Sequence, residues 1–246
     1  MMKWLWKEGI SITENQLVPD IEENLERIRS CVAQAMKTAR RGDSVRIMAV
    51  TKMISPDRVN RAISLGIDLI GENRVQELLQ KYDFYRKNGC DIHFIGHLQT
   101  NKVKYIIDKV DMIESVDSLR LAEEIERQCV RVNRKMDILV QINAGREESK
   151  YGLYPEEVPG FLEKVSAYRH LRVKGLMAVM PKCGNEKEIC MYFAKMNHLF
   201  LDSRVKNIDN INMVSLSMGM TDDYVLAVEN GATIIRIGRG LFGARS

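Results

Sequence analysis

The sequence has no CxxC motif, no HExxH motif, no long apolar run and no block of like charge. Its five cysteines are an odd number and its four histidines are scattered, so the pattern predicts neither a disulfide framework nor a zinc site. The first residues, Met1 to Glu8, are charged too early to form the apolar core of a signal peptide. No apolar run reaches the length that a membrane span needs. We therefore expect a cytoplasmic protein with free cysteines, no bound metal and no membrane segment.

The charge of the chain does not point to a macromolecular partner. The formal net charge is +4, from 37 basic and 33 acidic residues that are mixed along the chain. Mixed charge is typical of a solvated surface, so we expect no nucleic-acid partner, and a small anionic ligand is compatible. The length of 246 residues and the apolar content of 45% suit one large domain with a sizeable core.

Strand-like and helix-like segments alternate from residue 46 to the end of the chain. The apolar segments predict strands at 46–52, 68–73, 92–97, 112–116, 136–143, 173–179, 213–217 and 233–238. Amphipathic segments predict helices between them, for example over 100–109, and an extra N-terminal helix over 18–41. Eight such units close a single-domain (β/α)8 TIM barrel, and an open doubly wound sheet is the alternative. We expect residues 1–17 to form a tail and 18–246 to form the barrel with its N-terminal helix.

The first predicted strand, Arg46 to Lys52, ends on a lysine. If Met48 and Val50 point into the barrel, the alternation of side chains along a strand sends Lys52 the same way. A desolvated lysine loses its proton more easily and can attack a carbonyl group as a free amine. Lys52 is therefore a candidate for a Schiff base, and a strand-end lysine that reaches water is the alternative.

Glycine-rich loops follow the last two predicted strands, where TIM barrels often bind phosphate. The first loop contains Ser217, Met218 and Gly219, and the second begins with Gly238 and Arg239. Glycine lets backbone N–H groups approach an oxyanion, while a serine hydroxyl and an arginine add further donors. Each loop alone could be a tight turn, but the two together favour a phosphate site.

Arg236 lies on the otherwise apolar eighth strand and should point inward. A buried arginine stays charged and needs an acceptor, which could be a core carboxylate, Glu72 or Glu114, or an atom of a ligand. A reactive lysine, a phosphate site and an inward arginine together suggest a ligand with a carbonyl group at one end and a phosphate at the other. Pyridoxal 5′-phosphate (PLP) fits this description. His93 and His97 are expected to be packed side chains rather than ligands.

Long motifs in a fixed order make the chain similar to one known family over residues 18–245. The chain resembles the YggS/PROSC family, the pyridoxal phosphate homeostasis proteins. The matching segments are Ala49–Lys52, Gly71–Glu77, His93–Lys102, Ser149–Leu153, Gly175–Ala178, Leu216–Asp223 and Ile235–Arg245. Two positions differ from the common pattern: Arg239 stands where threonine is frequent, and His97 stands where proline is common.

The resemblance implies an alanine-racemase-like PLP fold, fold type III, with PLP bound to Lys52 as a Schiff base. It places Asn73 beside the cofactor, Ser217, Met218 and Gly219 at the phosphate, and Arg236 at the pyridine nitrogen. The second loop, with Gly238 and Arg239, would complete the phosphate site.

The resemblance also implies a role in intracellular PLP homeostasis, as a carrier without robust turnover, and therefore no catalytic residues. An arginine at the pyridine nitrogen disfavours a second proton there, so the ring is a poorer electron sink. We expect a monomer whose partners are PLP and PLP-dependent apoenzymes. A weak PLP-dependent amino-acid racemase is the alternative, and a Schiff-base aldolase is disfavoured because its lysine typically lies on a later strand.

Overall fold

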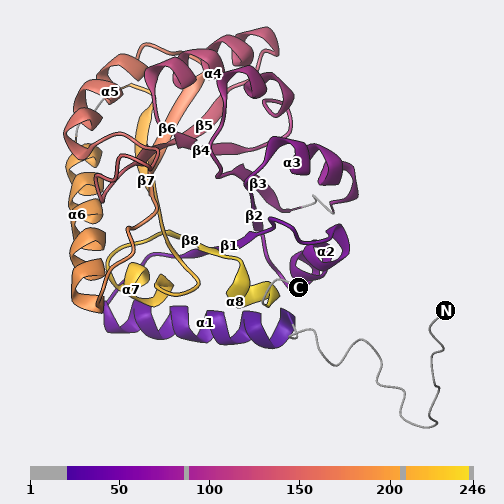
Figure 1. The fold of residues 1–246 in the computed structure, drawn as a ribbon, viewed down its shortest axis with the longest axis vertical. Helices are drawn as coiled ribbons and strands as arrows, with labels where there is room; N and C mark the ends of the chain where they lie inside the picture. The colour runs from indigo at the N-terminus through magenta and orange to yellow at the C-terminus, as the bar shows by residue number, and fades with distance from the viewer. Residues whose placement is uncertain (1–20, 86–88, 206–208, 244–246) are drawn as a thin grey trace, which may run out of the picture.

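The computed structural model describes residues 21–85, 89–205 and 209–243. Eight parallel strands form a closed barrel in which β8 pairs with β1, as Figure 1 shows. The strands are β1 (Arg46–Val50), β2 (Leu69–Glu72), β3 (Asp91–Phe94), β4 (Met112–Val116), β5 (Met136–Ile142), β6 (Leu171–Ala178), β7 (Ile211–Met220) and β8 (Ile234–Ile237). The predicted TIM barrel is confirmed, and the open sheet is wrong.

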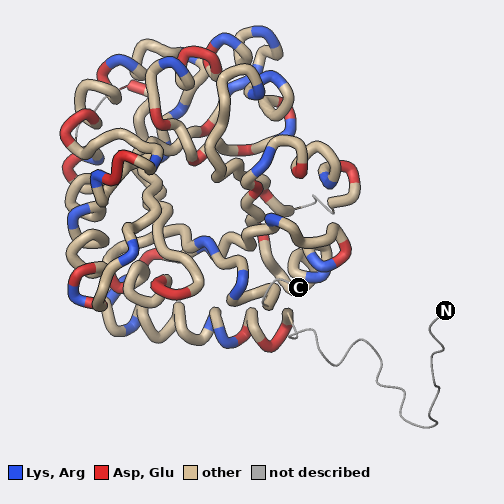
Figure 2. The backbone as a smooth tube through the Cα atoms, in the orientation of Figure 1, with Lys and Arg blue, Asp and Glu red and all other residues tan. Residues whose placement is uncertain are grey.

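Helices surround the barrel and connect its strands. The α-helices are α1 (Ile21–Thr38), α2 (Pro56–Ser64), α3 (Val75–Lys81), α4 (Leu119–Arg131), α5 (Val158–Val165), α6 (Glu186–Arg204), α7 (Tyr224–Glu229) and α8 (Arg239–Phe242). The described residues also contain the short 3-10 helices η2 (Tyr82–Phe84), η3 (Thr100–Tyr105) and η4 (Pro155–Glu157). Acidic and basic residues are interspersed over this ring of helices (Figure 2).

The predicted helix over 100–109 is confirmed only in its first part, because the segment forms the 3-10 helix η3 and then continues in turns. Its buried apolar residues include Val103 and Ile106, which lie three positions apart. A 3-10 helix has three residues per turn and brings positions i and i+3 onto one side. The tighter helix therefore buries this pair within a short crossover between β3 and β4.

The extra N-terminal helix is confirmed as α1, which ends at Thr38, before the predicted end at 41. Its buried apolar residues recur every three or four positions, which gives the helix one face to bury. That face packs against α7 and α8, as Figure 1 shows along the lower edge. Asn24 Nδ2 also donates a hydrogen bond of 3.1 Å to the carbonyl oxygen of Leu241. The predicted tail and residues 18–20 lie outside the described residues.

Two kinds of core hold the barrel. The larger core lies between the sheet and the helices and includes Ala49 and Ile235. A small separate cluster lies inside the barrel, where side chains on the other face of the strands meet: Met48, Leu69 and Ile234. A second interior cluster contains Met112, Leu139 and Met177. Among the described residues, no helix is both long and apolar enough to cross a membrane.

Candidate functional site

Lys52 lies in the turn after β1 and not on the strand itself. The predicted strand over 46–52 is two residues too long, since β1 ends at Val50. Met53, the next residue in the turn, has a positive φ of 62°. Side-chain alternation therefore stops before Lys52, and the argument that placed it inside the barrel does not apply. Lys52 is half-buried at the C-terminal mouth of the barrel.

Side chains from β2 and α3 hold this turn in place. The hydroxyl of Thr51 donates to Oε1 of Glu72 at 2.7 Å. Lys81 Nζ donates to the carbonyl oxygen of Thr51 at 3.0 Å, and Glu77 Oε1 accepts from the backbone N–H of Met53 at 2.5 Å. Burial alone would raise the pKa of Glu77, but hydrogen bonds from Lys81 and Met53 outweigh it and lower that pKa. An ionised Glu77 therefore holds Met53 directly, while its ion-pair partner Lys81 holds Thr51.

We predict that Glu77→Gln loosens this turn. The substitution removes a charge-assisted hydrogen bond to Met53, so hydrogen exchange at the Met53 amide should become about tenfold faster. Glu163→Gln is the matched control, because Glu163 is exposed on α5. Exchange measured by NMR should change at Met53 only in the first variant. Equal exchange at Met53 in the two variants would show that Glu77 does not hold the turn.

The two carboxylates considered as partners of Arg236 lie on opposite sides of the sheet. Glu72 accepts hydrogen bonds from Thr51 and Tyr85 behind β2, and its Oε2 atom has no partner among the described residues. Burial is the main cause that raises the pKa of Glu72. Glu114 instead points into the barrel toward Arg236.

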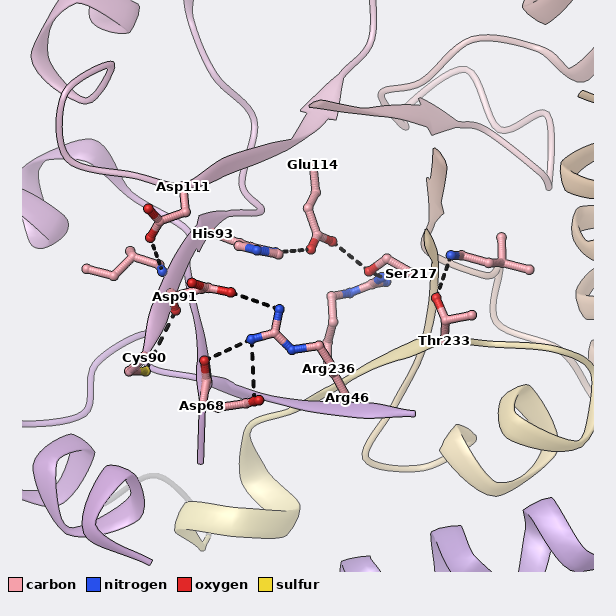
Figure 3. A network of polar contacts seen from close by, with 12 residues as sticks. Arg46, Asp68, Cys90, Asp91, His93, Asp111, Glu114, Ser217, Thr233 and Arg236 are labelled. Atoms are coloured by element: carbon pink, nitrogen blue, oxygen red, sulfur yellow. Dashed lines mark hydrogen bonds and ion pairs between the residues drawn. The ribbon is translucent and has the colours of Figure 1, made fainter. Parts of the chain in front are cut away.

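A chain of hydrogen bonds crosses the barrel interior from β3 to β8 (Figure 3). His93 Nδ1 and Glu114 Oε1 are 2.7 Å apart. The Ser217 hydroxyl donates to Glu114 Oε2 at 2.6 Å, and Arg236 Nη1 donates to that hydroxyl oxygen at 2.8 Å. Arg236 Nη2 also donates to the carbonyl oxygen of Ala178 at 2.7 Å. His93, predicted to be a packed histidine, is indeed buried, and it also lines a cavity of about 230 Å³ at the N-terminal mouth.

Opposite charges face each other along this chain of hydrogen bonds. Burial alone would raise the pKa of Glu114, but the hydrogen bond from His93, the nearby Arg236 and the Ser217 hydroxyl together lower it. Burial lowers the pKa of Arg236, and the negative charges of Glu114 and Asp223 oppose this effect. An arginine starts from so high a pKa that it stays charged. Arg236 therefore sits as a cation beside an ionised Glu114.

The buried guanidinium of Arg236 has more N–H donors than hydrogen-bond acceptors around it. It is 4% exposed, which confirms that the side chain points inward. A guanidinium carries five N–H groups, and two of these donate to Ser217 and Ala178. The remaining three have no acceptor among the described residues. The guanidinium can therefore still donate to a ligand that brings an acceptor, while its two terminal nitrogen atoms stay held by the protein.

Asn73, at the end of β2, offers a hydrogen-bond acceptor, where Arg236 offers donors. Its Oδ1 atom is buried and has no hydrogen-bond partner among the described residues. The loop after β3 packs directly on it, since a Cβ atom at Gly96 would lie 2.0 Å from the Asn73 carbonyl oxygen. Asn73 is thus held beside the mouth of the barrel with an acceptor atom free.

β7 runs to Met220, so the strand predicted over 213–217 is too short, and Ser217, Met218 and Gly219 lie on the strand and not in a loop. The chain after β7 meets α8, where the Gly240 N–H donates to Thr221 Oγ1 at 3.1 Å. Met218 is fully buried in the outer core, and Gly219 has a φ of +91° with α7 packed closely against it. A Cβ atom at Gly238 would lie 3.6 Å from Val50 Cβ, so the loop after β8 meets the end of β1 just before Lys52.

Arg239 turns to the surface in this structure. It is the first residue of α8, and its Nη2 atom pairs with the carboxylate of Asp222 at 2.7 Å. The side chains of this pair are 60% and 79% exposed. Exposed ion pairs contribute little to stability, so this contact leaves Arg239 free to exchange Asp222 for another anion.

The side chains that support the site carry no clear signal in the sequence. The roles of Glu77, Lys81 and Tyr85 depend on how α3 and η2 pack behind β2, and only the four-residue spacing of Glu77 and Lys81 hints at a pair. The expectation that His97 is packed is wrong, because β3 ends at Phe94 and His97 is exposed in the loop that follows. Its ring stacks on the exposed Tyr151 with centroids 3.7 Å apart. That stack joins the loops after β3 and β5 at the mouth of the barrel.

Comparisons with known proteins agree with this architecture. The chain matches the family model described as alanine racemase, N-terminal domain, over residues 23–246. A pyridoxal phosphate homeostasis protein of Aquifex aeolicus (strain VF5) is 37% identical and covers 91% of this chain and 97% of its own. The solved structure of PipY of Synechococcus elongatus PCC7942 with PLP bound is 30% identical, with a TM-score of 0.79 over 91% of this chain and 100% of that chain. PipY without PLP has a TM-score of 0.82.

Proposed function

Since the chain belongs to the pyridoxal phosphate homeostasis proteins, within the alanine racemase N-terminal domain family, we propose that it binds PLP covalently through Lys52. The observation that carries the proposal is the buried Arg236, which is held through Nη1 and Nη2 and has three further N–H groups that can donate to a ligand. The PLP bound to PipY supports it. When bound, PLP supplies an aldehyde carbon at which one amine can replace another.

The residues present fit such a ligand at both of its ends. In the proposed arrangement, Arg236 donates to the ring nitrogen and Asn73 lies beside the ring. The backbone of Ser217, Met218 and Gly219 and the loop at Gly238 hold the phosphate, and Arg239 adds positive charge there. Lys52, which lies in the turn held by Glu77 and Lys81, provides the amine.

We propose that the protein holds and delivers PLP and does not turn over an amino-acid substrate. Arg236 remains charged beside Glu114, so it donates a hydrogen bond to the ring nitrogen and opposes a proton there. A ring without that proton stabilises negative charge on a substrate carbon poorly, which suits storage and transfer. The recipients would be PLP-dependent apoenzymes, and the proposed carrier is a monomer.

The test is the absorbance spectrum of the purified protein with added PLP, before and after borohydride. We expect a visible band that borohydride removes, and we expect Lys52→Ala to lack it. Lys109→Ala is the control, because that lysine pairs with Asp108 just before β4, at the other end of the barrel. A band of equal strength in Lys52→Ala would contradict the proposed anchor.

The racemase alternative has its own readout. An enzyme of that kind would exchange the α-proton of alanine in deuterated water when loaded with PLP. We expect no exchange above that of free PLP, and sustained exchange that depends on Lys52 would replace the carrier with an enzyme.

A further inference from the structure

The Ser217 hydroxyl already has a hydrogen-bond partner on each side. It is fully buried, donates to Glu114 Oε2 at 2.6 Å and accepts from Arg236 Nη1 at 2.8 Å. A hydroxyl group has only one hydrogen to donate. That hydrogen is directed at Glu114, so the lone pair that remains on the oxygen could only repel an anionic phosphate.

Moving this hydroxyl to a phosphate would break up the buried chain. Glu114 is completely buried, and Ser217 is the donor to one of its two oxygen atoms. A buried carboxylate that loses a hydrogen bond is destabilising, because nothing then replaces the water molecules it lost on burial. Arg236 would lose its contact at Nη1 at the same time, so two buried charges would each lose a partner.

The other anchor of Arg236 shows what the hydroxyl does instead. Nη2 donates to the carbonyl oxygen of Ala178 at 2.7 Å, on β6. Ser217 on β7 and Ala178 on β6 thus hold the two terminal nitrogen atoms of the guanidinium, which fixes its plane. The three remaining N–H groups keep a constant direction because those two contacts are fixed.

We propose that the Ser217 hydroxyl is a positioning group that orients Arg236 toward the ring end of the ligand, and that it is not a phosphate ligand. The inference rests on the proposed function, because it assigns a role within the same PLP site. It leaves the backbone near the end of β7 available to the phosphate. Glu114 takes part as the acceptor that fixes the direction of the hydroxyl.

The experiment compares two ligands that differ only at the ring nitrogen: PLP, and its analogue with a C–H group in that position. Both keep the phosphate and the aldehyde. We expect Ser217→Ala to weaken PLP binding about tenfold, the effect of one well-placed hydrogen bond, and to leave binding of the analogue within about twofold. The dissociation constants are measured from the absorbance change on titration.

Ser115→Ala is the matched control. Ser115 is also fully buried, but its hydroxyl has no hydrogen-bond partner among the described residues. We expect both ligands to bind this variant as they bind the unmodified protein. If Ser217→Ala does not fold, Ser217→Cys keeps nearly the same volume with a weaker donor, and the same selective loss is expected.

Two results would overturn the inference. An equal loss for PLP and the analogue would place the hydroxyl at the phosphate, and no loss for either would show that it does not position Arg236. Failure of the proposed function looks different, because the unmodified protein would then form no borohydride-sensitive band with PLP, and the inference would fail with it.

Discussion

Replacing Glu114 with glutamine is expected to lower the free energy of unfolding by about 3 kcal/mol at pH 7. The side chain keeps its shape but loses its charge, so the buried, cationic Arg236 loses the stronger of the two negative charges that compensate it. Removing one member of a buried charged pair is costly for this reason. The measurement is urea denaturation of the ligand-free protein, followed by circular dichroism.

The effect of Glu114→Gln should depend on pH in a defined direction. The pKa of Glu114 in the folded protein lies below its ordinary value of 4.5. The unfolded chain therefore binds this proton more readily, and the stability that Glu114 provides is present above about pH 4.5 and is lost as the pH falls further. The difference in the free energy of unfolding between the variant and the unmodified protein should therefore become smaller as the pH falls below about 4.5.

Glu126→Gln is the matched control for this prediction. Glu126 also contacts a histidine, with His170 Nδ1 at 2.9 Å, but this pair is partly exposed at the surface. We expect a loss below about 1 kcal/mol there, because solvent screens the charges. Equal losses in the two variants would mean that the buried chain adds nothing beyond an ordinary surface contact.

Gly96→Ala is expected to destabilise the protein by about 3 kcal/mol and to weaken PLP binding at the same time. The new Cβ atom would lie 2.0 Å from the carbonyl oxygen of Asn73 and 2.7 Å from its carbonyl carbon. Both are backbone atoms, which cannot rotate away as a side chain can. The end of β2 must therefore move, and it carries Asn73 out of its place beside the mouth.

Gly160→Ala isolates this effect from the general cost of changing a glycine. Gly160 lies inside α5, and a Cβ atom there would have no atom within 4 Å. Alanine has a higher helix propensity than glycine, so the free energy of unfolding of this variant should rise by about 0.5–1 kcal/mol. Thermal unfolding and PLP titration of both variants test the prediction. A Gly96→Ala protein with unchanged stability and affinity would contradict it.

The barrel was predictable because each strand is an apolar segment followed by an amphipathic one. Strand ends were less predictable, and Lys52 shows the reason. The apolar pattern runs on through Thr51, but its hydroxyl reaches Glu72 and the chain turns there, with Met53 at a positive φ. That turn depends on side chains of β2 and α3, which no local pattern of residues 46–52 contains.

The partner of Arg236 could not be chosen from the sequence alone, since Glu72 and Glu114 both interrupt apolar strands. The structure separates them by alternation. Glu114 comes two residues after Met112, which faces the interior, whereas Glu72 comes three residues after the interior-facing Leu69. Side chains two apart on a strand share a face, so only Glu114 points inward. The choice required knowing which residues face the interior.

The packing of α1 on α7 and α8 has a consequence for the order in which the molecule is made. The hydrogen bond from Asn24 to Leu241 joins residues separated by 217 positions. On the ribosome α1 emerges long before α7 and α8, the helices that cover its apolar face. Contacts of such long range form slowly, and an uncovered apolar face is prone to aggregation until they do. Synthesis of this protein therefore leaves α1 uncovered until α7 and α8 have been made.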